Sequence, residues 1–86
     1  MPAREMLADL LTLARRPAEA LAEYKTVLKM YPNRFDALYG AAGAADSLGD
    51  RRAAADFYAK LIAICAPGAD RPELQTARQY LAANRN

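Results

Sequence analysis

Apolar side chains recur every three or four residues along almost the whole chain, as at Leu7, Leu10, Leu11 and Ala14 near its start. This spacing places them on one face of a helix, and a sustained alternation of apolar and polar residues, typical of strands, is lacking. The pattern predicts an all-α protein. Its five helices are expected over about residues 3–14, 17–31, 34–48, 51–65 and 71–84.

Residues that start and stop helices divide the periodic segments. Pro17 suits the first turn of the second helix. Asn33 is predicted to be the N-cap of the third helix, with Asp36 reaching back to it as in a capping box. Gly49 is a predicted C-terminal stop, and Asp50 is the predicted N-cap of the fourth helix. The connections are short, so successive helices should pack antiparallel.

The chain repeats itself at an offset of 34 residues. This offset places like residues on one another in both helices of a pair: Ala8 on Ala42, Ala20 on Ala54, Tyr24 on Tyr58, Val27 on Leu61 and Leu28 on Ile62. The unit resembles the tetratricopeptide repeat, a 34-residue helix–turn–helix whose pattern includes A-x3-F and a final proline. The matching positions are Ala20, Tyr24 and Pro32 in the first copy, and Ala54 and Tyr58 in the second, where Pro67 comes one residue late.

The resemblance implies a single domain over residues 1–86. Antiparallel helix-turn-helix repeats would stack as a short right-handed α-solenoid, with repeat one at about 1–34 and repeat two at about 35–68. The last helix, at about 71–84, would be a capping helix. The large aromatic residues that the family has in the first helix of each repeat are lacking in both copies.

Two glycines, Gly40 and Gly43, lie in the third predicted helix, where each costs roughly 1 kcal/mol relative to alanine. We interpret them as sites of close packing. Gly40, Ala44 and Ser47 share the side that should meet the first two helices, and Gly43 lies nearer the concave side.

The equivalent side of the first helix carries Met6, Leu10 and Leu13, for which the chain provides no covering repeat. Terminal repeats usually present a polar outer face. Two explanations stay open, and they are compatible. The chain is expected to be a C-terminal fragment of a longer repeat protein, or to form a homodimer through the first helix.

Composition removes several classes of function. Histidine is lacking and Cys65 is the only cysteine, so the commonest general base, a cysteine-cluster metal site and an intramolecular disulfide are excluded. We therefore predict neither an enzyme nor a cofactor or metal site. A net charge of +2 gives no sign of a nucleic-acid partner, and no apolar run reaches the ~20 residues that would predict membrane insertion.

The resemblance implies a concave groove that receives a protein or peptide partner. Its predicted lining is mainly acidic and comprises Glu5, Asp9, Thr12, Asp36, Tyr39, Gly43, Asp46 and Arg78. A basic or mixed-charge partner peptide or helix is expected, with Tyr39 as its anchor. The alternative is a purely structural C-terminal cap or self-association element without an outside ligand. The compartment is left open: cytoplasmic by default, or periplasmic if a longer parent carries an export signal.

Overall fold

The computed structural model describes residues 3–65 and 71–83, with side chains from residue 6 onward. Within these ranges the protein is all-α and has no strand, which confirms the predicted fold class. The helices are α1 (Ala3–Leu13), α2 (Pro17–Met30), α3 (Phe35–Ser47), α4 (Arg51–Ala63) and α5 (Pro72–Ala83).

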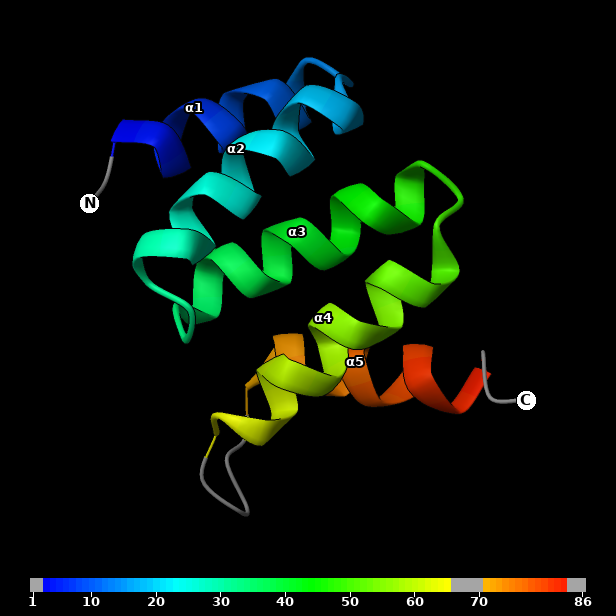
Figure 1. Ribbon diagram of the computed structural model, residues 1–86. Coiled ribbons are helices and arrows are strands. Elements are labelled where there is room, and N and C mark those ends of the chain that lie inside the picture. Colours follow the sequence, from blue (N-terminus) through cyan, green and yellow to red (C-terminus); the bar gives the residue numbers. More distant parts are fainter. Residues whose placement is uncertain (1–2, 66–70, 84–86) are drawn as a thin grey trace.

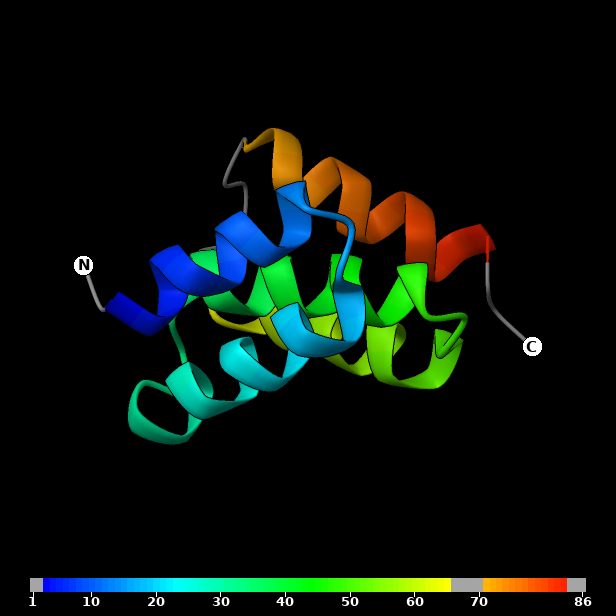
Figure 2. The same ribbon diagram turned by 90° about the horizontal axis from the view of Figure 1, so that it is seen from above.

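The helices pack against their neighbours in sequence order, as expected of helical repeats (Figure 1). Seen from above, α1 and α5 lie on one side and α2 and α4 on the other, with α3 between them (Figure 2). Some direct contact also joins α1 and α3. The Arg71 guanidinium carbon lies 3.8 Å from the ring centroid of Phe35. This cation–π contact joins the start of α5 to the start of α3.

Most helix boundaries follow the predicted local chemistry. Pro17 is the first residue of α2. Gly49 adopts a left-handed backbone with φ of 80°, directly after the C-cap of α3. The next residue, Asp50, caps α4 by accepting a hydrogen bond from the Ala53 N–H at 3.1 Å.

The predicted capping box at the start of α3 is wrong. The N-cap is Arg34, not Asn33, and its side chain makes no capping hydrogen bond. The Arg34 N–H donates to the Tyr31 carbonyl, which closes a turn around Asn33 and delays the helix by one residue. Asp36 is consequently the second residue of α3, where its charge favours the helix N-terminus without a reciprocal cap.

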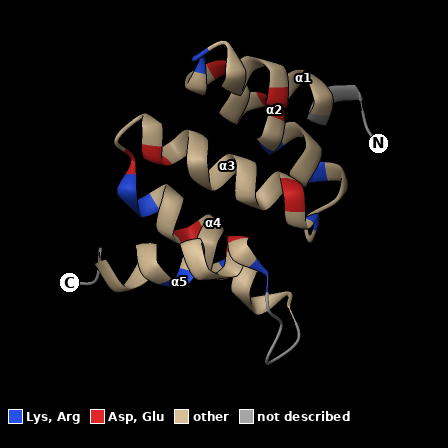
Figure 3. Ribbon diagram, turned by 180° about the vertical axis from the view of Figure 1, so that it is seen from behind, with Lys and Arg blue, Asp and Glu red and all other residues tan. Residues whose placement is uncertain are grey.

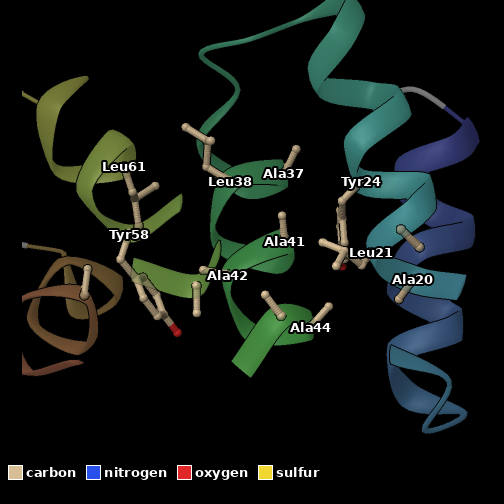
Figure 4. Packing of buried hydrophobic residues seen from close by; sticks show 14 of the residues in the cluster. Ala20, Leu21, Tyr24, Ala37, Leu38, Ala41, Ala42, Ala44, Tyr58 and Leu61 are labelled. Carbon is tan, nitrogen blue, oxygen red and sulfur yellow. The ribbon is translucent and has the colours of Figure 1, made fainter. Parts of the chain in front are cut away.

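The two faces of α3 are buried against different helices. In Figure 4, Ala37, Ala41 and Ala44 point toward Tyr24 and Leu21 of α2, and Leu38 and Ala42 lie on the side of α4. Alanine lets the helix axes approach closely, and larger side chains from α2 and α4 fill the space. The central helix is thus the common wall of both halves of the core.

Four pairs of positions related by the 34-residue offset are buried in both copies. Ala8 and Ala42, Ala20 and Ala54, Tyr24 and Tyr58, and Val27 and Leu61 are all at most 5% exposed. The turns differ in one respect. Arg15 occupies the position equivalent to Gly49 and also has a positive φ, of 61°, which costs a residue with a Cβ roughly 1–2 kcal/mol.

The two glycines of α3 have different surroundings. A Cβ atom built on Gly40 would lie under 3.0 Å from ring atoms and the hydroxyl of Tyr24, whereas a Cβ on Gly43 would meet nothing within 4 Å. Gly40 therefore permits the close contact with α2, as predicted. Ser47 does not share in it, because its side chain is exposed at the end of α3.

We expect Gly40→Ala to lower the free energy of unfolding by about 1–2 kcal/mol. The Tyr24 ring is buried and cannot move aside, so overpacking (~1–3 kcal/mol) exceeds the gain in helix propensity (~1 kcal/mol). Gly43→Ala is the matched control and should raise stability by up to about 1 kcal/mol. Urea unfolding followed by circular dichroism measures both, and equal effects of the two substitutions would contradict this assignment.

Candidate binding groove

A groove of about 400 Å³ opens beside α1 and α3. Its walls come from these two helices, and α2 and α4 each contribute one tyrosine. The groove thus depends on the packing of α3 on α2 and α4, since these contacts bring residues distant in sequence to one place. We refer to this cavity as the groove.

Five of the eight residues predicted from the sequence line the groove together. They are Asp9, Thr12, Asp36, Tyr39 and Gly43. Asp9, Thr12 and Asp36 are exposed, and Tyr39 is half-buried. Gly43 leaves this part of the wall open because no atom lies where its side chain would extend.

The other three predicted residues are not brought into the groove. The side chain of Glu5 lies outside the described part of the molecule. Asp46 is exposed in the last turn of α3, and Arg78 is exposed on α5; neither is part of the lining. Figure 3 shows acidic positions near both ends of α3, so this helix carries negative charge beyond the groove as well as in it.

Four lining residues were not predicted: Tyr24, Gly40, Ala44 and Tyr58. The two tyrosines are equivalent positions of the repeat, and their periodicity indicated only core packing. Both are indeed buried, yet one edge of each ring reaches the groove. Their exact offset of 34 residues was the available signal, because equivalent positions of stacked repeats face the same side.

Asp9 and Tyr24 are joined across the helices. The Tyr24 hydroxyl donates a hydrogen bond to the Asp9 carboxylate. Thr12 bonds within its own helix, donating to the Ala8 carbonyl at 2.9 Å. The Asp9 carboxylate thus has a fixed position at the groove wall while one of its oxygens remains available to a ligand.

Three tyrosines form a row that leads from the groove toward α5. The Tyr39 and Tyr58 rings meet edge to face at 6.4 Å, and the Tyr58 and Tyr80 rings lie 4.9 Å apart. Burial raises the pKa of the Tyr58 hydroxyl, with smaller contributions from neighbouring groups including Asp46. Burial also raises the pKa of Tyr80, followed by hydrogen bonding to and the charge of Asp46. These phenols are neutral donors at physiological pH.

The lining combines acidic and aromatic side chains, which are the groups that recognise a cation. Two carboxylates, Asp9 and Asp36, lie beside aromatic side chains, and no basic residue is among the described lining residues. A Lys or Arg side chain could meet both a carboxylate and a ring face there. Among the described residues no group of three or more potential metal ligands of the His, Cys, Asp or Glu type comes together.

The outer face of α1 is a separate apolar surface, formed by Met6, Leu7, Leu10 and Leu13. Their exposed fractions are 55%, 45%, 57% and 79%. Met6, Leu10 and Leu13 are equivalent to Gly40, Ala44 and Ser47 of α3. In α3, Gly40 and Ala44 face α2 while Ser47 is exposed, whereas in α1 this side meets no described residue that buries it.

The chain gives no significant match to a protein-family model, to a curated protein or to a solved structure. The groove and the outer face of α1 are therefore interpreted from their own geometry and chemistry. Of the described helices, none combines the length and the apolar character needed to cross a bilayer.

We expect Tyr24→Phe to destabilise the protein by about 1 kcal/mol, because it removes the donor to Asp9. A double-mutant cycle with Asp9→Ala isolates this bond, since Tyr24→Phe should cost much less when the carboxylate is already gone. Thermal and urea unfolding of the four proteins provide the measurement. Strictly additive effects would show that the two side chains do not interact.

Proposed function

We propose that the chain is a protein-interaction module of the tetratricopeptide type, whose groove holds a basic segment of a partner protein. The observation that carries this proposal is the meeting of Asp9, Asp36 and Tyr39 around a cavity that Gly43 leaves open. The partner segment would lie along α1 and α3 and insert a Lys or Arg side chain.

Four features support the assignment to this repeat type. The helices pack in sequence order, and four pairs of equivalent positions, among them Tyr24 and Tyr58, are buried in both copies. A left-handed residue ends the first helix of each copy, at Arg15 and Gly49. The groove lies on the side formed by first helices, where such repeats receive their ligands.

The acidic residues of the groove favour a basic partner segment over an acidic one. The two exposed carboxylates of the lining, Asp9 and Asp36, together attract a cation, and salt screens this attraction. A Lys or Arg over the Tyr39 face would gain about 0.5–1 kcal/mol more at such a partly exposed site. Acidic segments would be repelled, so the sign of the partner's charge is the first source of specificity.

Gly43→Leu provides the test. The added side chain should fill the groove and weaken binding of a short synthetic peptide with Lys and Arg between Ser and Gly residues at least about tenfold. The fold should be retained, because nothing occupies the space near Gly43 and leucine favours a helix. Ala22→Leu adds the same side chain at an exposed position of α2 and is the control.

Fluorescence anisotropy of the labelled peptide gives the affinity, and the melting temperature reports the fold. Asp36→Asn should weaken binding severalfold and reduce its salt dependence. The groove proposal fails if Gly43→Leu binds the peptide like the wild-type protein.

A second candidate function, assembly through α1, is favoured by the exposed residues of its outer face. The equivalent face of α3 is packed on a helix pair, so the face of α1 would accept a further repeat or a second copy of the chain. The residues differ in size, however. Met6 takes the place of Gly40, so an incoming helix could not present a tyrosine in the manner of Tyr24.

We expect the isolated chain to self-associate with increasing concentration, and Leu10→Glu to keep it monomeric. A charge placed within the apolar contact would cost several kcal/mol of association free energy. Leu48→Glu, which changes a similarly exposed leucine at the end of α3, is the control and should leave association unchanged. Size-exclusion chromatography with light scattering measures the oligomeric state. A wild-type protein that stays monomeric at all concentrations would contradict the self-association proposal.

A further inference from the structure

The chain contains three lysines, and all three line one pocket. Lys25 and Lys29 project from successive turns of α2, and Lys60 from the last turn of α4. The other basic residues of the sequence are arginines, none of which is in this lining. The pocket belongs to the side of the molecule built by α2 and α4, away from the α1 and α3 walls of the groove.

The floor of this pocket is apolar. Leu28, Pro32, Leu38 and Phe57 complete its lining. Leu38 is fully buried, and Leu28 and Phe57 are half-buried against the core. The volume of about 200 Å³ is below the range typical of cofactor and small-molecule sites, and it matches one large apolar side chain.

The three ammonium groups have no acidic partner within the described part of the chain. Arg16 and Glu19 form an ion pair on α2, but no carboxylate of the described residues lies within salt-bridge distance of any of the three lysines. No acidic residue lines the pocket either. Asp56 lies one turn before Lys60 on α4, outside salt-bridge distance, so the three lysines leave a net positive charge around this apolar floor.

We propose that this pocket is a second binding site, which takes an acidic protein segment carrying one large apolar side chain. The apolar side chain enters between Leu28 and Phe57, and carboxylates on either side of it pair with Lys25, Lys29 and Lys60. The proposal is independent of the groove, since the two cavities share no residue and attract opposite charges.

A peptide segment fits this site better than a membrane or a nucleic acid. Binding to a lipid surface relies on apolar side chains that protrude between basic ones, whereas here the apolar residues form a recess. A nucleic acid would meet few phosphate-binding groups, and the recess provides no polar group that could read a base edge. An acidic segment with a central aromatic residue satisfies both the charge and the recess.

The probe is a labelled synthetic peptide, Ser-Asp-Glu-Phe-Asp-Glu-Ser, titrated with the full chain at low salt. Replacing its Phe by Ser should weaken binding about tenfold, because the recess is then empty. The double variant Lys25→Gln/Lys60→Gln should weaken binding about fivefold, and Lys25→Arg/Lys60→Arg should retain it. Arg15→Gln/Arg52→Gln removes the same charge elsewhere and is the matched control.

Three outcomes would overturn the proposal. The peptide does not bind, the Lys25→Gln/Lys60→Gln and Arg15→Gln/Arg52→Gln variants lose the same affinity, or replacing Phe by Ser leaves the affinity unchanged. Preferential binding of phosphatidylserine vesicles would assign this face to a membrane instead. The groove is tested separately. Gly43→Leu should leave binding of the acidic peptide unchanged, and the lysine pair should leave binding of the basic peptide unchanged, so either site can fail without the other.

Discussion

The side chain of Tyr24 holds three of the five helices together. It belongs to α2, its ring lies against Gly40 of α3, and its hydroxyl donates to Asp9 of α1. A side chain at position 40 would push α3 away, and the alanines that face α2 would lose their contacts together. The close approach of α2 and α3 thus depends on the lack of a side chain at position 40.

The groove is a consequence of the same contact. Its base includes Tyr24 and Gly40, so the atoms that set the helix spacing also set the depth of the cavity. Gly43, one helical turn further along, has the opposite relation to the core, because its missing side chain leaves space toward solvent. Gly40 thus governs the stability of the helix packing, and Gly43 governs access to the groove. Substitutions at the two positions should therefore affect the two properties separately.

The sequence predicted best those features that depend on nearby residues. Gly49 and Asp50 define a turn through local geometry alone, and the turn was predicted correctly. The cap predicted at Asn33 was wrong because the chain makes a turn there, closed by the bond from the Arg34 N–H to the Tyr31 carbonyl, and α3 begins one residue later. The lysine pocket could not be predicted, because Lys25 and Lys60 meet only when the stacking of α2 and α4 on α3 is known.

The two copies differ at the positions that shape the groove. Asp9 of the first copy is equivalent to Gly43 of the second, so Tyr24 has a carboxylate partner in its own repeat while Tyr58 does not. Tyr58 instead packs between Tyr39 and Tyr80. Near Tyr24 a carboxylate is fixed to a tyrosine, whereas near Tyr58 the rings pack on one another and Asp46 lies beside Tyr80. Equivalent tyrosines of the two copies thereby have different surroundings, so the two ends of the groove differ in chemistry although the helices that form them follow one sequence pattern.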